Sequence, residues 1–277
     1  MRILKNGKQR AVATAICLVI FLLAGYFYNM TLSFYEPDID KVDISAIIKK
    51  ENLSDEDLMT LFTQTGVSPQ AIKDLGNNGM LISLQEMYFN KPEFKKNYIC
   101  FPITAEEKNT RQRTPLVKLK KGDIFVSFST HTLNWRHGHC AIVTDAGKGI
   151  ILEHMSAGNA SCLSKAEKWG RYPAFAVLRY NDEKVASKAA DYAIAHLKGV
   201  DYNILTGIVN KDKSDDESVD WSHCSHIVWQ AYKAVGVDLD SDGGVFVTPE
   251  DIAMSEELGV VQIYGINTER YKARILK

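Results

Sequence analysis

The stretch Trp221-Ser-His-Cys-Ser-His-Ile-Val-Trp-Gln-Ala-Tyr-Lys-Ala-Val-Gly236 decides the fold of this chain. Ser222 is a typical N-cap residue and Gly236 is a typical helix stop, so the residues between them are predicted to form an α-helix. Cys224 lies in the first turn, on the apolar face of this helix. The other members of that face recur at helical spacing: Ile227, Val228, Ala231, Tyr232 and Val235.

Cys224 occupies a position where a thiol ionises readily. Free amide groups and the positive end of the helix dipole favour a thiolate in the first turn of a helix. A thiolate attacks carbonyl carbon atoms, whereas a thiol does not. The alternative interpretation is that Cys224 is a small buried hydrophobe. The rest of the chain has to decide between the two.

The composition fits one large domain, or a small domain with a medium-sized one. The chain has 277 residues, of which 45% are hydrophobic, enough for a full core. Its 33 basic and 34 acidic residues nearly balance, so no nucleic-acid partner is predicted. The five cysteines form no Cys-x-x-Cys pair and no zinc-like spacing, so no metal site is expected. A single disulfide among Cys100, Cys140 and Cys162 stays open.

Residues 11–28 are predicted to cross a membrane. This run carries no charge, and at about 1.5 Å per residue it nearly covers a hydrocarbon core of ~30 Å. Residues 1–10 carry only basic charges, and acidic residues follow from Glu36 onward, which places the N-terminus in the cytoplasm. A cleaved signal peptide is the alternative. The length of the run and the lack of a clean cleavage site favour an uncleaved anchor.

Residues 29–118 are predicted to be a helical segment and linker. Helices are expected to begin at Ser54, which precedes an acidic first turn, at Ser68, which precedes a proline, and at Met80. Residues 97–118 are polar and irregular, so a solvated loop is expected there. The pattern leaves the role of the segment open between a spacer, a lid and a partner surface.

A β-hairpin carries the second and third candidate residues. Asp145-Ala-Gly-Lys-Gly149 is a typical hairpin turn. His139 stands at the mouth of the strand before this turn, and Glu153 ends the strand after it. Antiparallel pairing then brings both near the same end of the hairpin, where a carboxylate can accept the imidazole N–H and fix its tautomer. Further strands are predicted over 124–129, 174–180 and 260–264, with a helix over 182–198.

These motifs resemble those of NlpC-type papain-like hydrolases. Gly199-Val-Asp-Tyr202 and His223-Cys-Ser225 resemble the family's Tyr and Asp-Cys-Ser motifs. His139-Cys-Ala-Ile-Val143 with Ile151-Leu-Glu153 is similar to its His-Val-Gly-Ile strand pair. Here the hairpin precedes the cysteine helix, an order similar to that of the circularly permuted papain-like amidases of bacteria. The resemblance covers roughly Lys120 to Tyr264.

The resemblance implies an α+β fold, with a permuted papain-like domain over 119–277 whose antiparallel sheet packs on the nucleophile helix. It implies that Cys224 is the nucleophile, His139 the general base and acid, and Glu153 the orienting group. Tyr202 matches the loop tyrosine that helps the Cys224 backbone amide to bind the oxyanion. No cofactor or metal is implied.

Several histidines compete with this assignment. His154 follows Glu153 and could take the third role, and His226 stands where the permuted group has an acid. His137 would share a face with His139 if the strand began that early. A second interpretation makes six histidines surface or satisfied polar positions: His131, His137, His154, His196, His223 and His226.

The sequence therefore predicts a cysteine hydrolase that cleaves an amide bond in cell-wall peptides, held outside the inner membrane of a bacterium by residues 11–28. One alternative is a lipid acyl-ester hydrolase or acyltransferase on the same scaffold, and an acyl chain would suit the membrane tether. The other is an inactive module that binds wall peptides or a partner. An intact set of Cys224, His139 and Glu153 favours an enzyme, because a binding module does not need all three.

Overall fold

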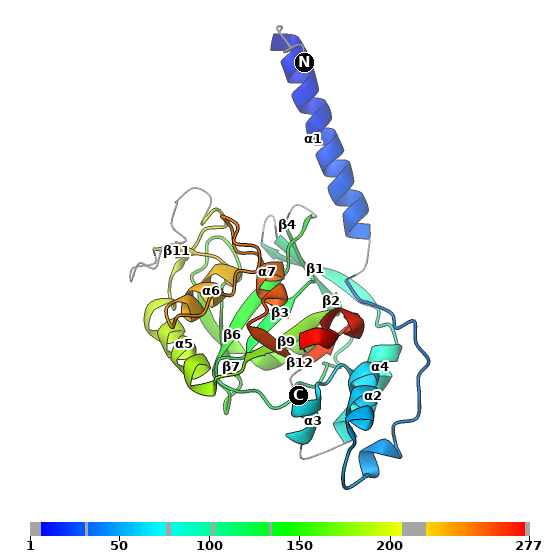
Figure 1. Cartoon of the computed structure of the whole chain (residues 1–277). Helices are drawn as coiled ribbons and strands as arrows, with labels where there is room; N and C mark the ends of the chain where they lie inside the picture. The colour runs from blue at the N-terminus through cyan, green and yellow to red at the C-terminus, as the bar shows by residue number, and fades with distance from the viewer. Residues whose placement is uncertain are drawn as a thin grey trace.

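The structure is a computed structural model that describes residues 7–30, 33–75, 79–100, 103–132, 135–206 and 220–274, without the side chains of 25–30. It confirms the expected α+β class, with helices packed on antiparallel sheets (Figure 1). Part of the basic flank predicted over 1–10 lies outside the described residues.

Six antiparallel strands form the main sheet, in the order β12-β9-β3-β6-β7-β8. These strands are β3 (Ile124–Ser127), β6 (His139–Asp145), β7 (Ile150–Glu153), β8 (Cys162–Lys165), β9 (Phe175–Tyr180) and β12 (Leu258–Tyr264). A second antiparallel sheet, in the order β1-β2-β4-β5, joins β1 (Phe94–Cys100), β2 (Ile103–Lys108), β4 (Thr130–Thr132) and β5 (Trp135–Arg136). The short strands β10 (Asp201–Tyr202) and β11 (Trp221–Ser222) form a parallel pair.

Helices cover both faces of the main sheet. The α-helices are α1 (Gly7–Met30), α2 (Asp55–Thr65), α3 (Pro69–Lys73), α4 (Gly79–Phe89), α5 (Glu183–His196), α6 (Cys224–Lys233) and α7 (Pro249–Met254). Three short 3₁₀ segments are η1 (Ile47–Lys49), η2 (Ala166–Arg171) and η3 (Thr268–Arg274). The three starts expected in the helical segment are confirmed: Ser54 and Ser68 cap α2 and α3 with their side chains, and α4 begins one residue before Met80.

Strand alternation divides the core into two layers, because successive side chains point to opposite faces. The layer under α5 and α6 contains the sheet residues Val126, Cys140, Ile142, Leu152 and Leu178. The layer under α2, α3 and α4 contains Phe125, Ala141, Val143, Ile151 and Val177. The helical segment before residue 118 therefore shares a core with the sheet that carries the candidate site.

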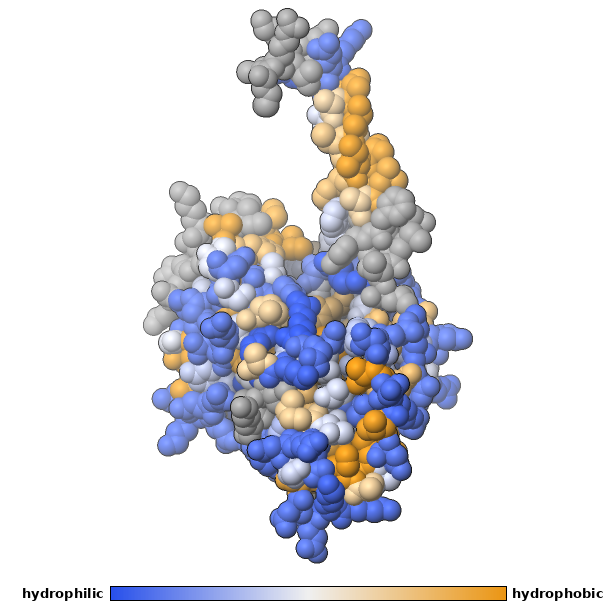
Figure 2. Space-filling view, turned by 45° about the vertical axis from the view of Figure 1, so that its right-hand side comes forward, coloured by the Kyte–Doolittle hydropathy of each residue, from blue (hydrophilic) through white to orange (hydrophobic). Residues whose placement is uncertain are grey.

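In the described part of the chain, α1 is the one helix that is long and apolar enough to cross a membrane. The candidate span is Gly7–Ala24, and none of it is buried in the protein. Figure 2 shows this helix as an apolar column above a body whose visible face is mostly hydrophilic. The predicted hydrophobic segment is confirmed to this extent, and its orientation and retention stay predictions.

The prediction of a loop over residues 97–118 is wrong for the first half of this range, which contains most of β1 and all of β2. Arg111 and Arg113, whose charges suggested a solvated loop, are exposed, but the charged residues of β2 are buried and have partners. Glu106 accepts from Arg136 at 3.3 Å, and Lys108 donates to Thr114 at 2.7 Å. Sequence polarity indicated exposure, but paired polar groups tolerate burial.

The N-cap expected at Ser222 is also wrong. Ser222 ends β11, and His223 is the N-cap of α6, with an extended backbone and a ring Nδ1 that accepts from the His226 N–H at 3.4 Å. Cys224 is consequently the first residue of the helix. The helix ends at Lys233, and Gly236 follows with a positive φ of 88° that favours glycine.

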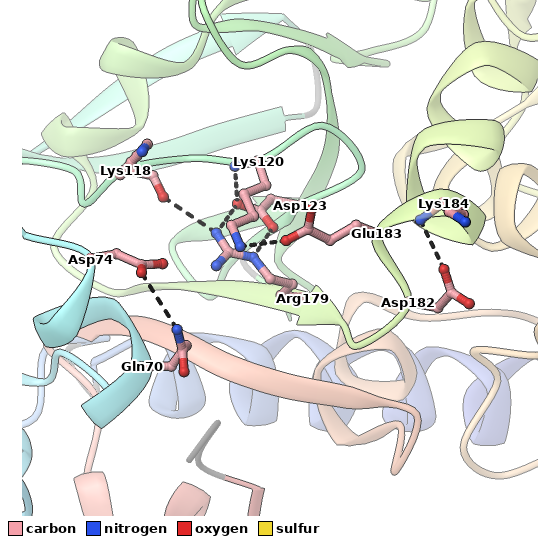
Figure 3. Close-up of polar contacts among 9 residues, drawn as sticks. All are labelled: Gln70, Asp74, Lys118, Lys120, Asp123, Arg179, Asp182, Glu183 and Lys184. Atoms are coloured by element: carbon pink, nitrogen blue, oxygen red, sulfur yellow. Dashed lines mark hydrogen bonds and ion pairs between the residues drawn. The ribbon is translucent and has the colours of Figure 1, made fainter.

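A buried ion pair holds the start of β3. Arg179 on β9 donates two hydrogen bonds of 2.7 Å to Asp123, whose carboxylate also accepts from the Lys120 N–H (Figure 3). The Tyr232 hydroxyl donates to the Gly122 carbonyl at 2.7 Å, which ties α6 to the same turn. The strand that pairs with His139 is thereby fixed at its far end.

Candidate active site

Cys224 is buried at the N-terminus of α6, where the helix meets the sheet. Its side chain is 6% exposed and belongs to the same core cluster as Cys140 of β6. As the first helical residue, Cys224 has a backbone N–H without a partner inside the helix. The sequence argument for a first-turn cysteine on the packed face therefore agrees with the geometry.

The register of the predicted hairpin brings His139 and Glu153 together. Glu153 lies opposite Ala141, so His139, two residues before Ala141, is its diagonal neighbour on the same face. The His139 Nε2 and the Glu153 Oε2 are 3.2 Å apart. An ionised carboxylate only accepts, so Nε2 carries the proton and the other ring nitrogen, Nδ1, is left to act as a base.

The thiol of Cys224 interacts with this imidazole. Burial alone raises the pKa of the thiol, but a hydrogen bond and the charge of His139 outweigh it. Backbone hydrogen bonds from Cys140 and Ser225 add to the effect, so the pKa of Cys224 lies below its usual value. A lowered thiol pKa is what a cysteine nucleophile requires near neutral pH.

The second oxygen of Glu153 is held by two residues that the sequence analysis missed. Ser164 Oγ donates to Oε1 at 2.5 Å, and the Lys168 ammonium forms an ion pair with the same oxygen. Burial, with the nearby charge of Arg171, lowers the pKa of Lys168 to about 8. These partners leave Oε2 to His139. Their positions depend on the β7–β8 register and on η2, so no spacing in the sequence pointed to them.

Trp169 fixes the plane of the imidazole. Its ring stacks on His139 with centroids 5.3 Å apart and planes 13° apart, and it is fully buried. The His139 ring thus has a carboxylate at its Nε2 edge and an indole on its face. It is oriented before any ligand arrives.

Tyr202 and His154 lie beside the nucleophile but do different things. Tyr202 lines the same cavity as Cys224, and burial raises the pKa of its phenol. His154 presents its ring to the edge of Tyr202 at 4.9 Å and places Nε2 3.1 Å from the Asn159 carbonyl oxygen. The partner of the His139 ring is Glu153, whereas His154 contacts Tyr202 and Asn159.

The interpretation of the remaining histidines as surface or satisfied positions holds in part. His196 is exposed, and His137 lies between β5 and β6, with its Nε2 2.8 Å from the Thr132 Oγ1. The strand begins only at His139, so the shared face considered for His137 does not exist. His131 is instead fully buried, and burial lowers its pKa to about 3.

Cys224 opens into a cavity of about 490 Å³. Most of the surface that faces this cavity is apolar. The apolar side chains in its wall are Phe21, Trp135, Tyr202, Ile204, Phe246 and Pro249. All five cysteines are free, so the disulfide left open among Cys100, Cys140 and Cys162 is not formed.

The structure brings together one acidic cluster that no metal-ligand spacing in the sequence predicted. Carboxylate oxygens of Asp240, Asp242 and Asp251 lie within 4.8 Å of one another. Asp251 is engaged in the capping box of α7, where it accepts from the Thr248 N–H at 2.7 Å. The cluster stands apart from the cavity of Cys224, whose wall contains none of the three.

In comparisons with known proteins, no protein-family model matches the chain, and no curated protein is significantly similar to it. The resemblance to permuted papain-like amidases and the roles of the site residues therefore stay predictions.

Proposed function

We propose that this protein is a cysteine hydrolase that cleaves its substrate by acyl transfer through a thioester on Cys224. The observation that carries the proposal is the buried chain of contacts from Cys224 through His139 to Glu153, with the thiol pKa lowered by the imidazole. A cysteine, a base and an orienting carboxylate in sequence are the parts of a nucleophilic triad.

The reaction follows from the positions of these groups. His139 takes the thiol proton, and the Cys224 thiolate attacks the substrate carbonyl carbon. The backbone N–H of Cys224 at the start of α6, with Tyr202 beside it, stabilises the oxyanion that forms. His139 then protonates the leaving group. It next deprotonates a water molecule, which hydrolyses the thioester and restores the thiol.

The permuted papain-like fold belongs to the same proposal. It is supported by the order of the parts, a histidine–glutamate hairpin followed by the cysteine helix, and by an antiparallel sheet packed on α6. The proposed location is the inner membrane of a bacterium, with the body outside the cytoplasm. The apolar helix α1 and its basic N-terminal flank support that location.

The bond proposed from the sequence is an amide in cell-wall peptides. A second candidate, the acyl ester of a lipid, is favoured by the apolar lining of the cavity at Cys224. An inactive binding module is the least supported reading, because it gives no reason for a thiol pKa lowered by an oriented imidazole.

The test uses an activated substrate that reports a reactive nucleophile and does not distinguish an amide hydrolase from a lipid esterase. The full chain in detergent is mixed with p-nitrophenyl acetate, and the Cys224 peptide is examined by mass spectrometry. A burst of nitrophenol with an acetyl group on Cys224 is expected, and neither should occur in Cys224→Ala. An intact thiol with no burst would overturn the proposal.

A further inference from the structure

The membrane helix contributes to the wall of the cavity that holds the nucleophile. Phe21 of α1 lines this cavity together with Cys224. Its ring stacks on Trp135 of β5, with centroids 4.6 Å apart and planes inclined by 28°. A helix that served only as a tether would have no reason to close the cavity of the site.

This contact fixes the height of the cavity relative to the candidate span. Phe21 lies near the body-side end of the candidate span, three residues before Ala24. Trp135 touches Phe21 and therefore lies at the same depth. Tryptophan is enriched at the boundary between hydrocarbon and water. A cavity bounded by Phe21 and Trp135 thus opens at the membrane surface if α1 spans the bilayer.

Several exposed apolar side chains are sequence neighbours of residues in the cavity wall. Leu205 is 47% exposed and follows Ile204 of the cavity wall; Val245 is 70% exposed and precedes Phe246 of that wall. Trp221, at the start of β11, is 48% exposed. In Figure 1, β11 and β4 lie at the end of the body from which α1 rises. Exposed apolar groups beside a cavity indicate contact with a membrane or a partner.

A more polar cavity shares a wall with the first. It also measures about 490 Å³, and both are lined by Arg136, His137 and Glu250. Its other walls include Asn267 and Arg270. An apolar space and a polar space side by side match an amphipathic molecule, with its chain in the first and its head group in the second.

We infer that the substrate is an ester-linked acyl chain of a membrane lipid, which enters from the bilayer along α1 and lies between Phe21 and Cys224. This inference rests on the proposed function. In the reaction, the Cys224 sulfur bonds to the ester carbonyl carbon, the ester C–O bond breaks, and the departing lipid oxygen takes a proton from His139. Water then cleaves the thioester to release a fatty acid. No oxidant or further co-reactant is needed.

The experiment uses the full chain reconstituted in vesicles of phosphatidylethanolamine and phosphatidylglycerol. Release of fatty acid is measured, with p-nitrophenyl acetate hydrolysis recorded on the same samples. Ester-linked lipids should yield fatty acid and an acyl group on Cys224, whereas ether-linked analogues should yield neither. Phe21→Ala should lower the ratio of lipid to acetate turnover by about tenfold, since the ring that stacks on Trp135 in the cavity wall is lost.

Leu22→Ala is the matched control, because Leu22 is the next residue of the same helix, is as exposed as Phe21 and does not line the cavity. Both activities should stay unchanged in this variant. Acetate turnover without lipid cleavage would overturn the inference and leave the proposed function standing. Equal ratios in the Phe21 and Leu22 variants would remove α1 from the substrate site. Loss of acetate turnover in the unaltered protein would instead overturn the proposed function.

Discussion

Two buried carboxylates lie at strand ends of the main sheet, Asp123 before β3 and Glu153 at the end of β7, and do different work. Asp123 precedes β3 and accepts two hydrogen bonds from Arg179 and one from the Lys120 N–H. Glu153 ends β7 and is only half occupied by Lys168 and Ser164, because its Oε2 faces His139. Both acids are buried and both have a cationic partner.

The difference teaches how to tell a structural ion pair from a candidate catalytic one. A carboxylate whose partners are only a structural arginine and a backbone N–H holds the fold and offers nothing to a reaction. A carboxylate that leaves one oxygen for an imidazole can orient a base. Burial and pairing alone do not separate Asp123 from Glu153, whereas the identity of the last partner does.

The largest effect is expected at the candidate nucleophile, Cys224. Cys224→Ala should abolish turnover, because the covalent route through the thioester needs the sulfur. The fold should survive, since alanine is the best helix former and keeps the Cβ. Acetate hydrolysis and a circular dichroism melt measure the two outcomes.

Cys140→Ala is the control for this variant. Cys140 packs in the core under α6, and burial raises the pKa of its thiol well above the usual value, so it is not nucleophilic. Its loss should leave turnover intact at some cost in packing. Activity that survives in Cys224→Ala and disappears in Cys140→Ala would contradict the whole assignment.

The next effect concerns the orientation of the imidazole. Glu153→Gln should lower the rate on the order of 10²–10⁴-fold, because a neutral amide stabilises the imidazolium less and does not fix its tautomer. His154→Ala should change the rate little, since its ring contacts Tyr202 and Asn159 rather than His139. Steady-state rates compare the two variants, and the reverse ranking would give the orienting role to His154.

At the Asp123–Arg179 ion pair, a substitution should change stability rather than rate. Arg179→Met leaves the carboxylate of Asp123, which is 1% exposed, without its main partner. Such a buried uncompensated charge costs about 3–5 kcal/mol of unfolding free energy. Denaturant unfolding measures the loss, and acetate turnover per folded molecule should persist. A variant of normal stability and low turnover would contradict the distinction between Asp123 as a structural carboxylate and Glu153 as a candidate catalytic one.

Local patterns predicted much of this molecule, and tertiary register supplied what they missed. The capped helices, the hairpin and the approach of His139 to Glu153 follow from periodicity, turn residues and alternation. The partners of Glu153 on β8 and η2 depend on how distant segments pair, as does the burial of β2. Polar residues there look solvated until their partners are known.

The smallest effect, and the most specific, is the pH dependence of Cys224. Its thiol pKa results from burial, which raises it, and from His139, which lowers it further than burial raises it. The thiolate is therefore present above a midpoint that lies below the ordinary pKa of a thiol, and it is lost as the pH falls through that midpoint. His139→Ala removes the main lowering group and keeps the burial, so the midpoint should rise. The rate of iodoacetamide labelling, followed on the Cys224 peptide alone, measures both midpoints without a substrate. Arg179→Met, read while the protein is folded, should keep the low midpoint, because the Arg179 charge is paired with Asp123 and is not among the groups that lower the pKa of Cys224. If the Arg179 variant moved the midpoint as far as the His139 variant, the thiolate would depend on the fold as a whole and not on the imidazole beside it.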